Sequence, residues 1–477
     1  MEFRETVDAL AGNGDLLTVD EPVADPDLAF ALAAESARSN GPAVLLTDVP
    51  GVGRLACGVR GGPDRMVRRR RLPWSRLAVG MGLPADATYE TMLDVLSTAP
   101  AERPPLQRRA AAASGHERDA SALCLPTVSS SDRPLVSEGL LAVEIDGRQF
   151  WAPVRGDLRG RTTLRLHVPA TVADRLEPGS ATVALGVPTA ALMAAHLSCA
   201  RTHPWRAWTA PEIAAALDDV PVAPHAGGLV PASAEIVLDG TVAPADDPAA
   251  GPRAAWESIA DATSVTVSVD RVATRSDPLV PLAPVGEPLG DDIHQTSLVE
   301  GARLQARVNG YWGVSPVSWI GLPVEAQLGV CFVASEILYA GFEWQLANTL
   351  FSFATSFDKV VVLDADAAFE DLARALDDIW VKAHPSHDWV FSEAAAPAAA
   401  APAYRRDGQT GSRLFVNAAW DPRWDEEFIA PEVNFEQMYP PEVRRTVEER
   451  WTELGFDGGN DAVDADDAAE GGESGGE

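Results

Sequence analysis

The stretch Leu140–Gly156, LLAVEIDGRQFWAPVRG, contains two runs of β-type residues separated by turn residues. Similar short runs continue through the region from Leu135 to Pro284, and helical patterns interrupt them only around Thr171–Leu176 and Thr209–Leu217. A series of many short strands is typical of a β-barrel or a β-sandwich. We therefore predict one of these two architectures for the middle of the chain.

The two flanks of this region have different patterns. Before about Pro100, helical spacings alternate with strand-like runs, and after Asp291 helices and strands alternate regularly. The second pattern predicts a three-layer α/β domain with a parallel or mixed sheet. The predicted units are an N-terminal α+β domain with its linker (1–115), a central β-rich domain (116–287), a C-terminal α/β domain with a terminal helix (288–456) and a disordered acidic tail (457–477).

The charge of the chain argues against one class of function. Of the 477 residues, 70 are Asp or Glu and 38 are Lys or Arg, which gives a formal net charge of −32. This charge repels polyphosphates, so we expect no nucleic-acid binding. We interpret the one dense basic run, Arg68–Arg71, as a surface segment paired with carboxylates. Lys359 and Lys382 are the only lysines, and this composition is typical of a protein from a salt-loving organism.

The cysteines and the apolar segments predict a cytoplasmic protein. The four cysteines stand far apart with no CxxC pair, which favours buried thiols in a reducing compartment. The N-terminus lacks the apolar run of a signal peptide, and the longest apolar stretch, Leu328–Phe342, is short and contains Glu336. We expect neither a signal peptide nor a membrane span.

Two arginines are candidates for binding an anion. Arg155 lies at the end of the strand-like run FWAPVRG, where its guanidinium group could clamp a carboxylate or a phosphate. Arg413 follows a glycine-rich loop in GQTGSRLFVNA, just before a strand-like run, and could hold a phosphate in the same way. Each arginine is also compatible with an ordinary structural salt bridge. The usual motifs of nucleotide hydrolysis, serine hydrolysis and zinc proteolysis are absent from the sequence.

Three of the eight histidines fall close to turns of the β-rich region, where a ligand site could assemble. They are His167, His196 and His225. Each of them is also open to the plainer interpretation of a surface or hydrogen-bonded histidine.

Six segments, taken in order, resemble the UbiD family of reversible decarboxylases, which use prenylated FMN. They are Phe3–Gly51, Phe150–Gly156 (FWAPVRG), Val230–Val242 (VPASAEIVLDGTV), Ser268–Pro281 (SVDRVATRSDPLVP), Asp291–Ala302 (DDIHQTSLVEGA) and Gly411–Ala418 (GSRLFVNA). The resemblance implies an N-terminal α+β domain, a central split β-barrel of the flavin-reductase type, and a C-terminal α/β domain whose last helix packs on a partner subunit. The implied partners are further copies of the chain, as a dimer or hexamer, or an active homologue.

The same resemblance implies a set of site residues. It makes Arg155 catalytic, and it implies a divalent metal held by His167 and His225. In place of two of the family's metal ligands, this chain has Phe150 and either Pro224 or His225. The implied cofactor contacts are Trp151, Ala152, Val154, Arg155, His167 and Arg413.

One part of the family's pattern is missing. The family carries two catalytic glutamates in an E-G-P-x-G-E run, and the matching run here, Ala250–Ala255, is AGPRAA. Three carboxylates nearby in the sequence, Asp246, Asp247 and Glu257, are possible substitutes, although a strand shifted by one residue turns its side chains to the other face.

Two hypotheses follow from this pattern. In the first, the chain is an active UbiD-like carboxy-lyase that decarboxylates an aromatic or α,β-unsaturated acid, with Arg155 holding the substrate carboxylate. In the second, it is a degenerate paralogue that binds a small carboxylic acid or another anionic ligand and serves as a binding or assembly subunit.

Overall fold

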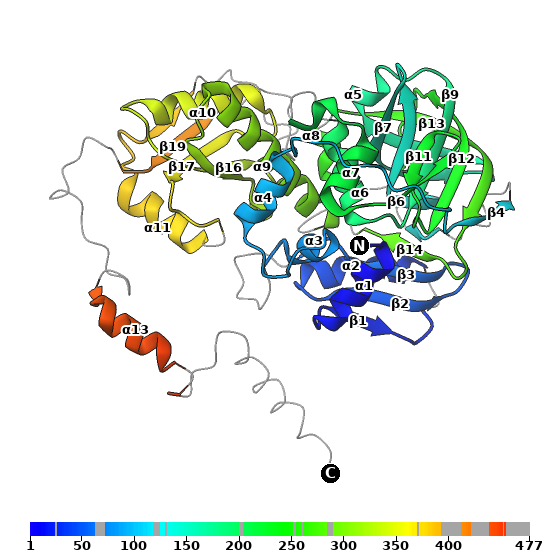
Figure 1. Ribbon diagram of the computed structural model, residues 1–477, viewed down its shortest axis with the longest axis horizontal. Helices are drawn as coiled ribbons and strands as arrows, with labels where there is room; N and C mark the ends of the chain where they lie inside the picture. Colours follow the sequence, from blue (N-terminus) through cyan, green and yellow to red (C-terminus); the bar gives the residue numbers. More distant parts are fainter. Residues whose placement is uncertain are drawn as a thin grey trace, which may run out of the picture. The chain divides into compact units, whose positions relative to one another are not determined.

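Figure 1 shows the chain as a computed structural model. The structure describes residues 1–23, 26–62, 72–117, 125–128, 131–199, 204–250, 254–259, 261–283, 290–369, 372–392, 412–420, 438–451 and 453–454. The arginine run 68–71 and the acidic tail 457–477 lie outside the described residues. The chain forms two compact units, one of residues 1–67 and 71–419 and one of residues 68–70 and 420–477, and each is described by itself.

The N-terminal part of the first unit is a four-stranded sheet with four helices. Its strands follow the order β1-β2-β3-β14, where β14 comes from the far side of the central domain and runs parallel to β3. A parallel connection needs a long crossover, and here the whole barrel supplies it. The strands are β1 (Leu16–Val19), β2 (Ala43–Val49), β3 (Gly53–Cys57) and β14 (Leu279–Leu282), and the helices are α1 (Phe3–Gly12), α2 (Pro26–Arg38), α3 (Ser75–Gly80) and α4 (Tyr89–Ser97).

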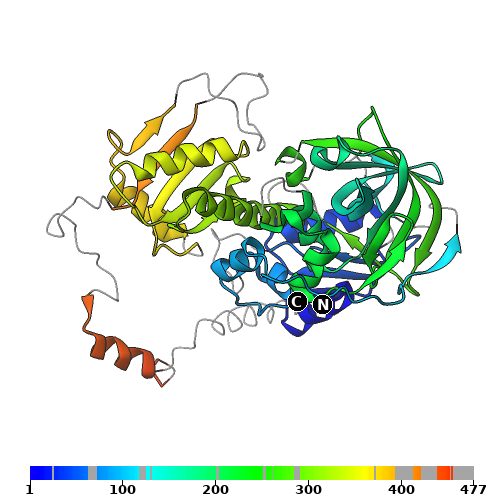
Figure 2. The same cartoon turned by 45° about the horizontal axis from the view of Figure 1, so that its top comes forward.

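The central domain is a closed six-stranded antiparallel barrel, which confirms the first of the two predicted architectures (Figures 1 and 2). Its strands follow the order β12-β9-β6-β7-β8-β13, and pairing between β12 and β13 closes the ring. Asp146 and Gly147 have φ angles of 55° and 73° and join β6 to β7 in a tight hairpin. The strands are β6 (Ser131–Ile145), β7 (Arg148–Arg159), β8 (Thr163–Pro169), β9 (Gly179–Leu185), β12 (Ile236–Pro244) and β13 (Ala262–Thr274).

Helices and short strands surround this barrel. The two helices expected from the sequence are present as α5 (Ala170–Ala173) and α7 (Ala210–Asp218), but α6 (Thr189–Cys199) was not expected. Because α6 is apolar and buried on almost every side, its sequence shows no amphipathic period. The remaining elements are η2 (Pro204–Ala207), α8 (Ala255–Ile259), β4 (Ser114–Glu117), β5 (Thr127–Val128), β10 (Val222–His225) and β11 (Gly228–Pro231).

The C-terminal domain of the first unit is built on a mixed five-stranded sheet, as the alternating pattern predicted. The strand order is β15-β16-β17-β19-β18, in which β16, β17 and β19 are parallel and the two edge strands are antiparallel. The strands are β15 (Val317–Gly321), β16 (Val330–Ser335), β17 (Lys359–Asp364), β18 (Trp389–Phe391) and β19 (Leu414–Ala418), and the helices are α9 (Asp291–Trp312), η3 (Val324–Ala326), α10 (Phe342–Phe353) and α11 (Leu372–Lys382).

An aromatic cluster connects the N-terminal helices to this sheet. Tyr89 on α4 and Phe369 after β17 have ring centroids 3.9 Å apart, and Trp74 and Trp319 pack against the same phenylalanine. The Tyr89 hydroxyl donates a hydrogen bond to the backbone carbonyl of Ile320 at 3.2 Å. These contacts tie α4 to β15, and α9 packs on both of these elements.

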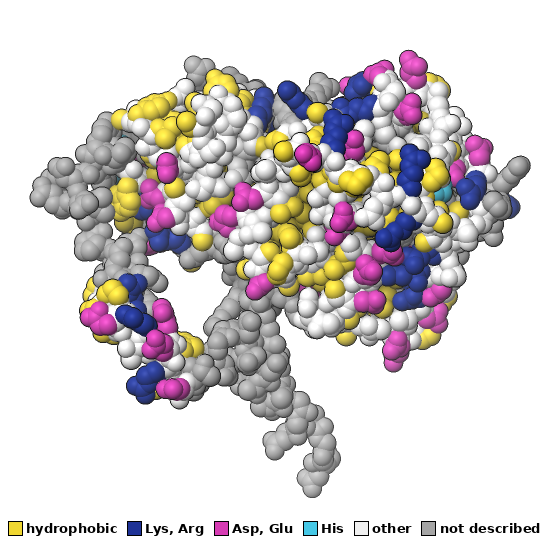
Figure 3. Space-filling view, in the orientation of Figure 1, with side chains coloured by type: hydrophobic (Ala, Val, Ile, Leu, Met, Phe, Trp, Pro, Cys, Tyr) yellow, Lys and Arg dark blue, Asp and Glu magenta, His cyan; other side chains and the backbone are white. Residues whose placement is uncertain are grey.

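The second unit contains the helix α13 (Pro441–Glu449), on which no residue is buried. Apolar and charged side chains share its surface, as Figure 3 shows. Val443 on the helix and Trp451 and Leu454 just beyond it are exposed. Among the described helices of the chain, none combines the length and the apolar character needed to cross a bilayer.

Candidate functional site

Arg155 and Glu257 form a buried ion pair between the barrel and the short helix α8. Both side chains are only 3% exposed, and the Arg155 Nε atom donates a hydrogen bond to Glu257 Oε1. Arg155 is on β7, directly opposite His167 on β8. Glu257 enters from α8, which follows the segment that lacks the family's two glutamates. One of the three possible substitute carboxylates therefore does meet the predicted catalytic arginine.

His167 holds the other oxygen of the same carboxylate. Its Nδ1 atom lies 2.8 Å from Glu257 Oε2, and its Nε2 atom accepts a hydrogen bond from the Ala249 N–H at 3.0 Å. Because Nε2 is an acceptor, Nδ1 carries the proton and donates it to Glu257. The Ala254 N–H adds a further hydrogen bond to Oε1 at 3.1 Å. Glu257 thus accepts hydrogen bonds from two strands and from its own helix start.

A second carboxylate, Asp292, lies beside this cluster. It belongs to the first turn of α9 and is buried, and the Ala255 N–H donates a hydrogen bond to its Oδ2 atom. Burial, together with the charge of Glu257, raises the pKa of Asp292 to about 6, although Arg155 partly opposes the shift. Burial would also raise the pKa of Glu257, but the hydrogen bond from His167 and the charge of Arg155 outweigh it and hold that pKa below its ordinary value. Two neighbouring carboxylates with opposite pKa shifts are typical of an acid–base site.

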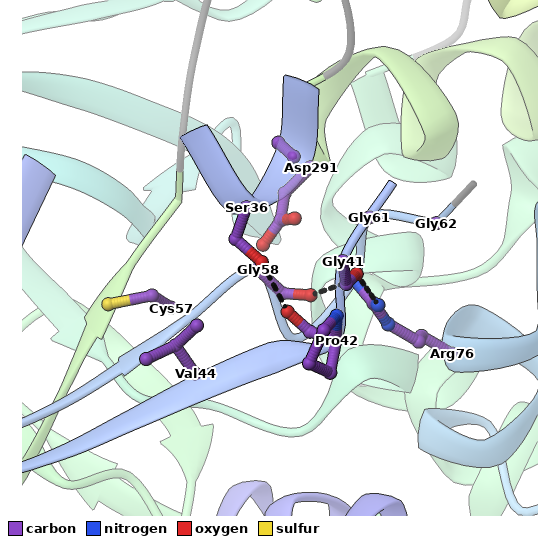
Figure 4. A pocket seen from close by; sticks show the side chains of 11 residues that line it. Ser36, Gly41, Pro42, Val44, Cys57, Gly58, Gly61, Gly62, Arg76 and Asp291 are labelled. Carbon is purple, nitrogen blue, oxygen red and sulfur yellow. Dashed lines mark hydrogen bonds between the residues drawn. The ribbon is translucent and has the colours of Figure 1, made fainter. Parts of the chain in front are cut away.

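Asp291, the preceding residue, faces different surroundings. It lines a small pocket among residues of α2, β2, β3 and α3 (Figure 4). Its Oδ2 atom accepts a hydrogen bond from the Arg60 N–H at 3.3 Å. Arg76 in the same pocket is bound to Asp15 at 2.8 and 3.0 Å. Burial and the charge of Glu138 raise the pKa of Asp291 to about 7.

One donor of the central arginine is unused. Within the described residues, the Arg155 Nη2 atom is buried and has no hydrogen-bond partner. A buried guanidinium donor without an acceptor is costly in a folded protein, so the site fits a ligand that brings an acceptor oxygen to this atom. A carboxylate or a flavin carbonyl group has the required chemistry.

Sequence profiles identify the family to which this geometry belongs. The profile of the 3-octaprenyl-4-hydroxybenzoate carboxy-lyase Rift-related domain matches residues 101–288, and that of the C-terminal domain matches residues 297–418. The chain belongs to the UbiD family. The resemblance seen in the sequence is thereby confirmed.

Individual relatives align with almost the whole length of this UbiD-family chain. Pyrrole-2-carboxylic acid decarboxylase from Pseudomonas aeruginosa is 23% identical over 504 aligned residues, which cover 96% of this chain and 98% of that protein. The open form of vanillic acid decarboxylase from Sedimentibacter hydroxybenzoicus has a TM-score of 0.73 at 17% identity and covers 95% of this chain and 98% of its own. An evolved dimeric form of the UbiD-class enzyme HmfF from Pelotomaculum thermopropionicum, in complex with prFMN, has a TM-score of 0.69 at 18% identity, with 93% and 99% covered. At these identities the two structures establish the fold.

The predicted cofactor contacts on β7 other than Arg155 have their side chains in hydrophobic cores. Trp151 packs against the core that contains α6 and donates from Nε1 to the Leu229 carbonyl at 2.8 Å. Ala152 and Val154 point to the opposite face and belong to the core inside the barrel. Trp151 therefore lies on the same face of β7 as Arg155, and Ala152 and Val154 lie on the other.

Arg413 is not among the residues that contact Arg155. It precedes β19, and its N–H donates to the Ser392 side chain at 2.8 Å. Its guanidinium group lies 5.1 Å from the centre of the Phe351 ring on α10. This is the amino end of a parallel strand, whereas ligands of such sheets usually bind at the carboxyl ends.

The two histidines expected to share a divalent metal do not meet. The Nδ1 atom of His225 lies 3.1 Å from Asp239 Oδ2, and Asp239 is opposite Arg271 on β13. His167 is opposite Ser264 on the same strand. The two pairing positions are seven residues apart, or roughly 23 Å at about 3.3 Å per residue.

The other positions of the implied metal site also lack ligands. The Phe150 side chain lies in the barrel core under the guanidinium groups of Arg148 and Arg175. Within the described part of the chain, no three His, Cys, Asp or Glu side chains are grouped so that they could hold a metal ion. His196 has its ring 6.4 Å from that of Trp256 and belongs to no such group among the described residues. The described residues do not fit the divalent metal implied by the family.

Sequence reasoning missed Asp292 and undervalued Glu257. Asp292 lies in DDIHQTSLVEGA, where two acids at the start of a helix have an ordinary explanation in the helix dipole. Glu257 stands out in the sequence only as a neighbour of the run 250–255, because its helix, AWESI, is too short to show a period. A useful signal was available in their position, since each acid lies in the first turn of its helix.

Proposed function

We propose that the chain is an active UbiD-class decarboxylase that acts on an aromatic or α,β-unsaturated carboxylic acid with prenylated FMN. The observation that carries this proposal is the buried cluster of Arg155, Glu257 and Asp292. It supplies an arginine and two carboxylates, although the run 250–255 contains no acid. The names of the relatives support the substrate class, since two of them are decarboxylases of pyrrole-2-carboxylic acid and vanillic acid.

The residues that would hold the cofactor are those of β7 from Trp151 to Val154. The unused Nη2 atom of Arg155 is left for the substrate carboxylate. We assign no phosphate contact to Arg413, because it lies at the amino end of β19 and contacts Ser392 and Phe351. When bound, prenylated FMN supplies the electron sink for the electrons of the breaking C–C bond. No step is assigned to a divalent metal.

The protein's own residues bind the substrate and transfer the proton. The positive charge of Arg155 binds and orients the substrate carboxylate, and Glu257 stays ionised and fixes the guanidinium group. Asp292 carries a proton up to a pH of about 6, because burial raises its pKa. After the C–C bond to the carboxyl carbon breaks and CO₂ leaves, Asp292 donates that proton to the same ring or alkene carbon. The Asp292 carboxylate then regains a proton from water.

The alternative is a catalytically degenerate paralogue that serves as a binding or assembly subunit. One observation favours it, namely that the described residues assemble no metal site like the one implied by the family. The two functions differ in turnover, since a binding subunit would retain an anionic ligand but release no CO₂.

The deciding experiment is production of the chain together with a flavin prenyltransferase in a high-salt buffer. We expect the visible spectrum of a bound modified flavin. We also expect the purified protein to decarboxylate pyrrole-2-carboxylate or a related aromatic acid in D₂O and to place deuterium in the product, at the carbon that had carried the carboxylate. Bound flavin without CO₂ release or deuterium exchange across a panel of aromatic and unsaturated acids would favour the binding subunit.

Location and self-association are further parts of the proposal. We propose a cytoplasmic location, which is supported by the three described cysteines, Cys57, Cys199 and Cys331, because all three are free thiols. We also propose that the chain associates with itself as a dimer or larger oligomer. The exposed apolar side chains of α13 support this, and a dimeric form of HmfF is known.

A further inference from the structure

His167 connects the two ends of the segment that carries the catalytic carboxylate. Its Nε2 atom accepts from the N–H of Ala249, and its Nδ1 atom contacts Glu257, eight residues later in the chain. Its ring is buried on β8, directly opposite Arg155. The imidazole is therefore a bridge from the strand pair β7–β8 to Ala249 and to Glu257.

Both nitrogen atoms of this ring are already used. The lone pair of Nε2 accepts the Ala249 proton, and the proton of Nδ1 goes to Glu257. A neutral imidazole has one lone pair and one N–H, so nothing remains with which to bind a metal. A metal on Nε2 would leave the buried Ala249 N–H without its acceptor, and a metal on Nδ1 would break the contact with Glu257.

The geometry around Glu257 shows what this bridge provides. Arg155 holds one carboxylate oxygen and His167 holds the other, so the carboxylate plane is fixed by donors from two adjacent strands. Helix α8 itself has only five residues. A second contact, from the Ala250 N–H to Asp157 Oδ1 at 2.6 Å, ties the same segment to β7.

We propose that His167 is a positioning residue that holds Glu257 against Arg155, and that it does this in place of binding a metal. Only the activity measurement rests on the proposed function. Metal binding and thermal stability test this inference separately. It predicts that the site works without a divalent ion on β8.

The test compares His167→Gln with His167→Ala in the holoenzyme. A glutamine amide can donate its NH₂ group toward Glu257 and accept the Ala249 N–H with its oxygen, so it retains the bridge but is a poor metal ligand. Alanine removes the bridge. The control is His225→Gln, which changes a histidine that contacts Asp239 near the other end of β13.

We expect dialysis against EDTA to leave the decarboxylation rate unchanged, and added Mn²⁺ to remain substoichiometric when measured by elemental analysis. The His167→Gln rate should stay within about tenfold of wild type, whereas His167→Ala should lose about 100-fold, because misplacement of a catalytic group by about 1 Å has an effect of that size. The His225→Gln rate should match wild type.

Two results would overturn the inference. One is stoichiometric Mn²⁺ that both His167 variants lose, and the other is a His167→Gln enzyme as inactive as His167→Ala. If the wild-type protein shows no turnover at all, the proposed function fails, but thermal unfolding still decides the inference. Wild type and His167→Gln should then unfold at similar temperatures, above His167→Ala and without any effect of Mn²⁺.

Discussion

Arg155 on β7 and Glu257 on α8 are 102 residues apart in the chain and form an ion pair that is almost fully excluded from solvent. Their meeting depends on the barrel, since β8 places His167 beside the arginine and the returning chain brings α8 to both. Removing one member of a buried pair leaves the other charge without a partner, which costs more than loss of the same contact at the surface.

The first prediction concerns this pair. Glu257→Gln removes the negative charge while keeping the size of the side chain, so Arg155 becomes an unpaired buried cation. We expect the free energy of unfolding to fall by about 3 kcal/mol and decarboxylation to fall by at least about 100-fold. Urea unfolding and steady-state rates measure the two effects.

The matched control is Glu300→Gln on α9. Glu300 is also buried and pairs with Arg303 at 2.7 Å, but this pair lies within one helix and does not contact Arg155. The Glu300→Gln variant should lose stability and keep the wild-type decarboxylation rate. A Glu257→Gln enzyme with wild-type turnover would show that this carboxylate has no part in the reaction.

A second prediction separates the two acids at the start of α9. Asp292 contacts the α8 backbone beside Glu257, whereas Asp291 faces the pocket of Figure 4. A positioned acid contributes roughly 10²–10⁴-fold, so Asp292→Asn should lose at least about 100-fold in rate, and Asp291→Asn should stay within about threefold. Single-turnover measurements with bound cofactor compare the variants. Equal losses in both would mean that the residues act through the helix rather than through one carboxyl group.

The sequence predicted the barrel and the mixed sheet because their strands are short, bounded by turn residues and repeated many times. It could not predict α6, since a helix buried on all sides has no polar face to set its period. The residues of the site were harder to predict from the sequence. Arg155 stands out in its strand, but its partner Glu257 is distant in sequence and lies on a helix of one turn, and Asp292 has a plain capping explanation. The expected metal pair failed because two histidines near turns can belong to opposite ends of a barrel.

The third prediction is a pH effect on stability. Burial and the charge of Glu138 raise the pKa of Asp291 from 3.8 to about 7. The folded protein therefore holds this proton up to a higher pH than the unfolded chain does. The contribution of Asp291 to stability is fully present below pH 3.8 and is lost as the pH rises through about 7.

The variant Asp291→Asn cannot ionise, so its stability should not show this loss. We expect it to unfold at the same temperature as wild type near pH 4 and at a higher temperature than wild type at pH 8. Thermal unfolding across this range measures the difference. A difference in unfolding temperature between the two proteins that shrinks toward pH 8 would contradict the prediction.

The last prediction concerns α13 and the proposed self-association. Val443, Val447, Trp451 and Leu454 recur at helical spacing, and three of them are exposed. Val443 and Val447 lie one turn apart on the helix and Trp451 and Leu454 follow it, so together they offer an apolar surface that a partner subunit could cover. Replacing Val443 and Val447 together with Glu should convert an oligomer to monomers, as measured by light scattering after size-exclusion chromatography. The control is Arg445→Glu, which adds an acid to the opposite side of the helix and should leave the oligomer intact. An oligomer that survives the double substitution would mean that another surface holds the subunits together.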